Sequence, residues 1–216
     1  AVSRTDSPVD FTVIASPNNP TGKMADPAFL DKLLQSTDAL VMVDEAYFEF
    51  SRFSMRPYLE ANENLVILRT FSKAFSLAGV RLGYIFAHPN VIKEYMKVRQ
   101  PYSVDAVSQA VGEVVYKNRA SFEPAIASII SERERMLTEL GKVPGVKTYP
   151  TDSNWVLFKM EGAAQAWEYL YDNGVLIRDF SKSADMPDCL RVTVGTPEQN
   201  DKFVQELRNF VLDPNR

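Results

Sequence analysis

The sequence predicts an α/β protein with a mostly parallel sheet, followed by a smaller α+β domain. Short apolar runs of strand length alternate with helical or irregular stretches through the first half of the chain, as in proteins with parallel sheets. One of these runs, residues 40–43, is apolar at every position, which is typical of a strand buried on both faces. After a long amphipathic segment at residues 121–140, strand-like and helical patterns begin again.

We expect a first domain at residues 1–122 and a second at residues 123–216. In the first domain the patterns predict strands at 11–15, 40–43, 65–68 and 84–87, and helices at 26–34, 90–100 and 104–116. Pro27 fits the first turn of the first helix. In the second domain they predict strands at 146–149, 155–160, 175–177 and 190–194, and helices at 163–173 and after 196–198. Thr196 is the expected N-cap of that last helix.

Composition is that of an ordinary soluble globular protein. The 216 residues are 45% hydrophobic and 24% charged, and the net charge of −4 is spread without a basic face, so we expect no nucleic-acid partner. No apolar run is long enough for a membrane span. The single Cys189 fits a reducing cytoplasm and has no metal-ligand spacing around it. We interpret the lone His88 as a loop residue, so no metal site is expected.

Lys73 is the most informative single residue. It follows a strand-like segment and lies between aromatic residues, with hydroxyls at Thr70 and Ser72. Desolvation favours the free amine, so a lysine in an apolar mouth can capture a carbonyl cofactor as a Schiff base. The alternative is an ordinary surface lysine in a polar loop.

Two upstream segments favour the first interpretation. Residues 16–22, SPNNPTG, form a sharp turn after a strand, and ligands of open α/β sheets gather at the carboxyl ends of strands. The buried strand at 40–43 ends in Asp44, with Tyr47 shortly after it. Each feature has a simpler alternative. Residues 16–22 could be a plain connecting turn, Asp44 could only cap the next turn, and Tyr47 could be a packed aromatic residue.

Four blocks in this order resemble the class I/II aminotransferases of fold type I, which use pyridoxal 5′-phosphate (PLP). The blocks are SPNNPTG at 16–22, VDEAY at 43–47, TFSKAFSLAGVRLGY at 70–84 and LRVTVG at 190–195. The match runs from about Phe11 to the C-terminus. Its details favour the histidinol-phosphate aminotransferase branch, and imply a partial fold type I large domain, a small C-terminal domain, a homodimer, and an amino donor and a 2-oxo acid as substrates.

The resemblance also implies a role for each matching residue. Lys73 would bind PLP covalently and move the substrate α-proton, and Asp44 would pair with the ring nitrogen. Asn19 and Tyr47 would hydrogen-bond the phenolic oxygen of the cofactor. Its phosphate would be held by Arg81, Thr70 and Ser72. Arg191 would clamp the substrate carboxylate, and Arg178 is a weaker candidate for a distal phosphate.

Alternatives remain open at this point. Arg81 could be a structural ion-pair residue, and Arg191 or Arg178 could face water. Threonine-phosphate decarboxylases and aromatic aminotransferases share the same cofactor residues. From another class, the chain could be a non-catalytic binding or assembly module.

The resemblance further implies that sheet strands on both flanks, the N-terminal arm and an early glycine-rich phosphate turn are missing. We therefore expect an N-terminally truncated product that is inactive, or nearly so, by itself.

Overall fold

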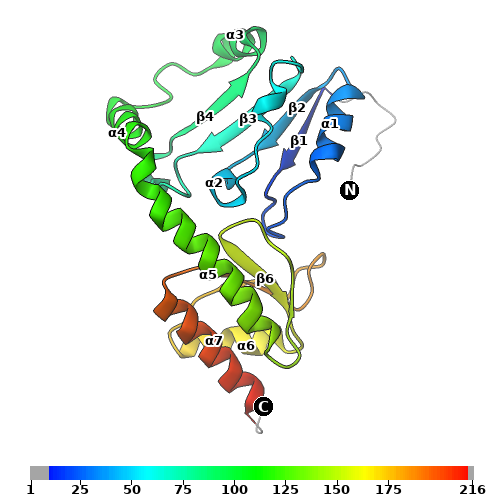
Figure 1. Cartoon of the computed structure of the whole chain (residues 1–216), viewed down its shortest axis with the longest axis vertical. Coiled ribbons are helices and arrows are strands. Elements are labelled where there is room, and N and C mark those ends of the chain that lie inside the picture. The colour runs from blue at the N-terminus through cyan, green and yellow to red at the C-terminus, as the bar shows by residue number, and fades with distance from the viewer. Residues whose placement is uncertain (1–9, 214–216) are drawn as a thin grey trace. The chain divides into compact units, whose positions relative to one another are not determined.

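The computed structural model describes residues 10–213, which form two compact units (Figure 1). Of the described residues, unit 1 takes in 10–18 and 24–122, and unit 2 takes in 19–23 and 123–213. The short stretch from Asn19 to Lys23 thus packs with the second unit, although its neighbours in sequence belong to the first.

Unit 1 is built on one four-stranded sheet. Its strands and helices, in chain order, are β1 (Phe11–Ala15), α1 (Pro27–Gln35), β2 (Leu40–Asp44), α2 (Phe48–Ser51), β3 (Leu65–Thr70), β4 (Gly83–Ala87), α3 (Pro89–Val98) and α4 (Ala106–Lys117). Short 3₁₀ turns lie at Arg56–Tyr58, Ala78–Val80 and Arg119–Phe122. The strand order is β1-β2-β3-β4; the first three strands are parallel and β4 is antiparallel to β3. The predicted α/β class with a mostly parallel sheet is confirmed.

Helix α1 forms where the sequence provides both a cap and an apolar face. Asp26 accepts a hydrogen bond from Ala28 N at 3.0 Å, and Pro27 occupies the first turn. The helix buries Leu30 and Leu34 on one face of the sheet, against core residues of β2 and β3 (Figure 1). Those core residues are Val41, Val43, Leu65 and Ile67.

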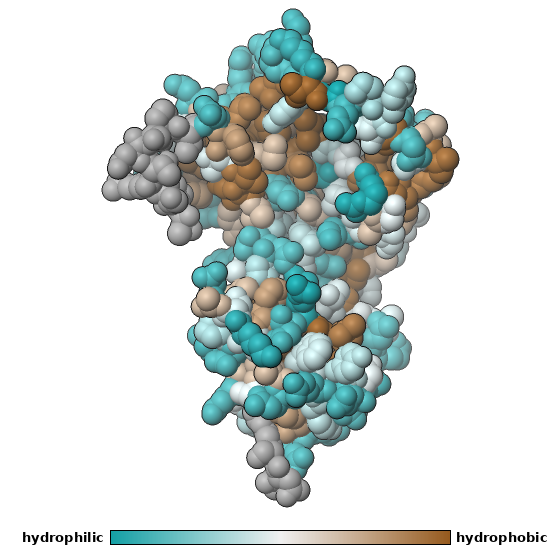
Figure 2. Space-filling view, turned by 180° about the vertical axis from the view of Figure 1, so that it is seen from behind, coloured by the Kyte–Doolittle hydropathy of each residue, from teal (hydrophilic) through white to brown (hydrophobic). Residues whose placement is uncertain are grey.

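The opposite face of this sheet is also apolar but is less covered. Strand alternation sends Phe11 and Val13 of β1 to that face, where they are 63% and 55% exposed. In Figure 2, seen from behind, apolar residues gather on the surface of unit 1. Contiguous apolar surface of this kind is a common site of association.

Unit 2 is an antiparallel sheet covered by helices on one face. Its elements are α5 (Glu123–Gly141), β5 (Lys147–Thr148), β6 (Trp155–Lys159), α6 (Ala163–Asp172), β7 (Arg178–Asp179), β8 (Cys189–Thr193) and α7 (Pro197–Leu212). The strand order is β5-β6-β8-β7, and every pairing is antiparallel.

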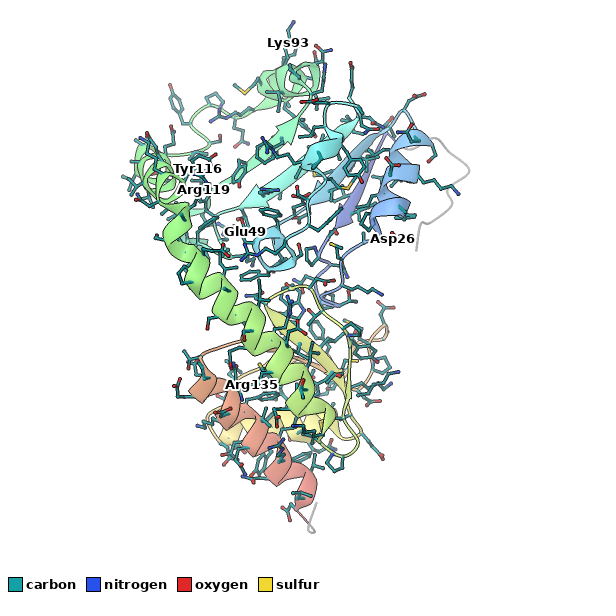
Figure 3. The ribbon with its side chains drawn as sticks, viewed as in Figure 1. Asp26, Glu49, Lys93, Tyr116, Arg119 and Arg135 are labelled. Carbon is teal, nitrogen blue, oxygen red and sulfur yellow. The ribbon has the colours of Figure 1, made fainter. Side chains whose placement is uncertain are left out.

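The core of unit 2 joins its three helices to the sheet. Phe158 of β6 packs against Phe203 of α7, with ring centroids 5.9 Å apart, and both side chains are buried. Helix α7 starts with a capping box, in which Thr196 accepts from Gln199 N and the Gln199 side chain accepts from Thr196 N. Arg135 of α5, labelled in Figure 3, forms ion pairs with Glu132 at 2.7 Å and with Asp201 of α7 at 2.6 Å.

The structure corrects one local prediction and confirms another. The strand expected at residues 175–177 is not formed; β7 begins at Arg178, because Val175 N instead bonds back to Leu170 O at 2.8 Å after α6. His88 is a loop residue, as predicted. It is the N-cap of α3, and its side chain accepts a hydrogen bond from Asn90 N at 3.3 Å. Among residues 10–213, no helix combines the length and apolar character needed to cross a membrane.

Candidate active site

The candidate residues of unit 1 gather where three parallel strands end. The register aligns Ala15 of β1 with Asp44 of β2, and Asp44 with Leu68 of β3, so the carboxyl ends of these strands share one edge. Because β4 runs the other way, its first residue, Gly83, pairs with Thr70 at the same edge. The antiparallel β4 therefore brings the preceding Arg81 to this edge.

Asp44 keeps one carboxylate oxygen available. Val41 and Val43 point into the core, so alternation sends the half-buried Asp44 to the other face. Its Oδ1 accepts from Ala46 N at 2.9 Å, which caps the following turn. Within residues 10–213, Oδ2 accepts no hydrogen bond. The turn-capping role predicted as an alternative for Asp44 thus accounts for Oδ1, and Oδ2 is available to a ligand.

Lys73 and Tyr47 lie together. Tyr47 is the N-cap residue of α2, and the Lys73 Nζ is 5.3 Å from the centroid of its ring. The exposed lysine side chain projects from a loop that is held by aromatic anchors on both sides. Phe71 and Phe75 are buried with ring centroids 5.6 Å apart, and Leu77 N bonds to Phe71 O at 3.1 Å. The amine is therefore exposed while its backbone is fixed.

Three further candidates line one depression of about 800 Å³ in unit 1. They are Thr70, Ser72 and Arg81. Arg69 and Arg99 also line this depression, and the guanidinium of Arg69 is already paired with Glu45, which leaves those of Arg81 and Arg99. Thr70 Oγ1 accepts from Ser72 N at 3.0 Å, which orients the start of the loop. Arg81 has a φ of 56°, a left-handed conformation that costs energy in a residue other than glycine. Two guanidinium groups and two hydroxyls form a donor set suited to a phosphate.

Two groups of unit 1, the buried Glu49 and the half-buried Tyr84, have shifted pKa values. Burial raises the pKa of Glu49 on α2 to about 7, although the charge of Arg69 opposes the shift (Figure 3 labels Glu49). Burial likewise raises the pKa of Tyr84, whose ring centroid is 5.5 Å from that of Phe71.

Unit 2 carries the remaining candidates. Arg191 of β8 is half-buried and donates through Nη1 to Oδ1 of Asn19. Its guanidinium is 5.1 Å from the ring of Trp155 and 5.7 Å from that of Phe180. Since Asn19 accepts through its oxygen, its NH₂ group remains a donor, and it has no partner among the described residues.

Arg178 lies directly across from Arg191. The two are paired in the register of β7 and β8, and the Arg178 guanidinium is also 5.7 Å from Phe180. Like charges facing each other across strands destabilise a sheet, so an anion that binds between them relieves the repulsion.

The stretch that presents Asn19 is fixed at both ends. The Trp155 indole donates to Pro20 O at 2.9 Å, and Asp152 N donates to Gly22 O at 2.8 Å. Gly22 has a φ of 77°, and a Cβ there would lie 2.2 Å from the Thr151 hydroxyl. The glycine of the SPNNPTG turn is thus required for both conformation and close approach.

A family model for aminotransferase class I and II matches residues 2–207. The chain belongs to this family. Within it, the chain is 40% identical over 199 residues to the histidinol-phosphate aminotransferase of Thermoanaerobacter sp. (strain X514). That match covers 92% of this chain and 56% of the relative, so the chain spans little more than half of that relative's length.

Solved structures of aminotransferase-like proteins share the fold. The L-threonine-O-3-phosphate decarboxylase of Porphyromonas gingivalis superposes with a TM-score of 0.85 and 26% identity, over 98% of this chain and 67% of that one. The histidinol-phosphate aminotransferase of Clostridium acetobutylicum gives a TM-score of 0.87 at 23% identity, over 94% and 64%. The fold is therefore that of the aminotransferases, as expected.

Several residues of the site had no signal in the sequence patterns. Trp155 and Phe180 flank Arg191, but their patterns indicated only strand and loop. Glu45 and Arg69 form a buried ion pair at 2.8 Å directly behind the strand ends. In the sequence, the only sign of this pair was Glu45, the second acidic residue of the VDEAY block.

Proposed function

We propose that the protein is a PLP-dependent aminotransferase of the histidinol-phosphate type, which transfers an amino group from histidinol phosphate to 2-oxoglutarate. One observation carries the proposal: the Lys73 amine lies beside the Tyr47 ring, at the strand-end edge where one carboxylate oxygen of Asp44 accepts no hydrogen bond from any described residue. The 40% identity to a histidinol-phosphate aminotransferase supports the choice of substrate.

The residues present fit this cofactor. Thr70, Ser72 and Arg81 line one depression and supply the donors that a phosphate needs. Asp44 can accept a hydrogen bond from a protonated ring nitrogen, and Lys73 is the exposed amine nearby. When bound, PLP supplies an electron sink for the negative charge that develops at the substrate α-carbon.

The chain's own residues would do the rest. The Lys73 amine would hold the cofactor and carry the α-proton, and the Asp44 carboxylate would keep the ring nitrogen protonated. The Tyr47 hydroxyl and the Asn19 NH₂ group would each donate to the phenolic oxygen. Arg191 would bind the carboxylate of 2-oxoglutarate or glutamate, since histidinol phosphate has none, and Arg178, paired with Arg191 across the ladder, would bind a second anion. We propose a homodimer in the cytoplasm as the working form.

The test uses the longest natural gene product that contains this chain. The protein is incubated with PLP, reduced with borohydride, and digested to locate the labelled lysine. We expect the label at Lys73. The substitution Lys73→Ala should abolish labelling and lower turnover at least about a hundredfold, because it removes the proton-carrying group. Lys97→Ala, an exposed lysine of α3 paired with Glu94, should leave both unchanged.

The alternatives give different results. Release of CO₂ from threonine phosphate without 2-oxo acid formation would indicate a decarboxylase like the Porphyromonas protein. Failure of any lysine to take up PLP would contradict the proposal and favour a non-catalytic module.

A further inference from the structure

A buried hydrogen-bonded cluster lies directly behind the strand ends that carry the candidate residues. Glu45 is 2% exposed and Arg69 is 8% exposed. Arg69 donates to Oε2 of Glu45 through Nε at 3.0 Å and Nη2 at 2.8 Å. The other oxygen, Oε1, accepts from Met55 N at 2.6 Å.

The cluster ties three chain segments together. The Ser54 hydroxyl lies between the two charged groups, 2.8 Å from Glu45 Oε2 and 2.7 Å from Arg69 Nη2. Glu45 begins the turn after β2, Arg69 lies near the end of β3, and Ser54 belongs to the segment after α2. The Arg69 guanidinium also stacks 3.5 Å from the centroid of the Phe48 ring at the start of α2.

Three members of this cluster, Glu45, Arg69 and Phe48, are chain neighbours of residues proposed to contact the cofactor. The neighbouring pairs are Asp44 with Glu45, Thr70 with Arg69, and Tyr47 with Phe48. Side chains alternate along β3, so Arg69 and Thr70 point to opposite faces of the sheet. Arg69 also lines the depression that Thr70 lines, but its guanidinium is bonded to Glu45 and Ser54. The cluster can therefore fix the backbone while its charged groups bond to one another.

Stability alone does not explain this arrangement well. The desolvation of two buried charges often exceeds their attraction, and a hydrophobic replacement of similar volume is frequently as stable. A rigid supporting shell, in contrast, is what a site needs to hold its contacting groups in a productive geometry.

We propose that Glu45 and Arg69 are positioning residues that hold the Asp44 carboxylate and the Tyr47 ring in place for the cofactor, an inference that rests on the proposed function. Neither residue touches the cofactor. Their effect passes through the backbone of the β2–α2 turn and the end of β3.

The test is a PLP titration of the longest natural gene product, monitored by absorbance across a pH series, with a urea denaturation of each variant. The variants are Arg69→Met and Glu45→Gln. The matched control is Arg133→Met in unit 2, since Arg133 is also 8% exposed and donates to Ser153 O at 3.1 Å. Arg69→Met and Glu45→Gln should weaken PLP binding about tenfold or more, because small misplacements of contacting groups have large effects. They should also move the pH at which the absorbance of the bound cofactor changes.

The control separates positioning from general stability. Arg133→Met should lower the denaturation midpoint while leaving PLP affinity and the pH profile unchanged. Unchanged affinity and pH profile in both cluster variants, with normal uptake by the unsubstituted protein, would overturn the positioning role alone. No uptake by the unsubstituted protein would overturn the proposed function and this inference together. If Arg69→Met does not fold, Glu45→Gln decides the matter, because it keeps the side-chain shape and removes the charge.

Discussion

The two sheets of the molecule use the same strand alternation but differ in how completely they are covered. In unit 2, the core face of the sheet is packed by α5, α6 and α7, and even Trp155 and Leu157 on the other face are 3% and 4% exposed. In unit 1, one face holds the core, whereas Phe11 and Val13 on the other are more than half exposed. Unit 2 therefore completes its own burial, and unit 1 leaves apolar sheet surface in contact with solvent.

The sharpest test of this difference is the same kind of substitution made in the core of unit 2 and on the exposed sheet face of unit 1. Phe203→Ala in the core of unit 2 should reduce the free energy of unfolding by about 3–5 kcal/mol, because it removes a buried ring and leaves a cavity. Phe11→Ala on the exposed face of unit 1 should have a far smaller effect. Urea denaturation followed by circular dichroism measures both units, and tryptophan fluorescence then identifies the transition of unit 2, since both tryptophans, Trp155 and Trp167, lie there. Equal effects of the two substitutions would contradict the comparison.

One carboxyl group in each unit should respond to pH in the opposite direction to the other. Burial raises the pKa of Glu49 in unit 1 from 4.5 to about 7, so the folded state holds a proton that the unfolded state has lost between these values. The stability of unit 1 should therefore fall as pH rises from 4.5 to 7, by roughly 3 kcal/mol. In unit 2, hydrogen bonds from Arg135 and Asn200 lower the pKa of Glu132. Its contribution is present above the unfolded pKa and is lost as pH falls.

The effect of Glu49 can be measured by urea denaturation followed by circular dichroism at pH 5 and pH 8. Glu49→Gln should remove the loss of stability at pH 8. The exposed Glu60→Gln should retain it. If Glu49→Gln kept the same pH dependence as the unsubstituted chain, another group would have to be responsible.

The smallest expected change in stability concerns the uncovered face of unit 1. The double substitution Phe11→Thr/Val13→Thr keeps the strand preference and removes apolar surface, so stability should change by no more than about 0.5 kcal/mol. Self-association measured by sedimentation at high concentration should decrease. Phe29→Gln on α1, which removes a ring that is 44% exposed, serves as a control for general surface hydrophobicity. Equal association of all three proteins would show that the sheet face has no special role.

The elements that the sequence predicted best are those with a strong local signal. The apolar run at 40–43 ends in an acid, and β2 does end at Asp44. The direction of β4 was not predicted, because a period of two says nothing about strand polarity. Parallel neighbouring strands need a crossover connection, which is usually a helix. The connection from β3 to β4, residues 71–82, contains only a 3₁₀ turn, which is consistent with an antiparallel β4. Helix α2 has four residues, too few to show a helical period.

The site was predictable to the extent that it follows strand ends. Asp44 is the last residue of β2, Tyr47 and Lys73 follow the ends of β2 and β3, and the structure brings Lys73 to the Tyr47 ring. The long-range contacts around the site could not be predicted in this way. Glu45 and Arg69 are 24 positions apart, and Asn19 and Arg191 are 172 apart, so no local pattern could connect them. Their roles in the site remain proposals.

The membership of residues 19–23 in unit 2 has a consequence for biosynthesis. The hydrogen bond to the Pro20 carbonyl cannot form until Trp155, 135 positions later in the chain, has been synthesised. At typical translation rates this interval lasts on the order of ten seconds, during which the strand before the turn can already pair with β2. The C-terminal half, expressed alone as a continuous piece, would emerge from the ribosome lacking one of its own packing segments.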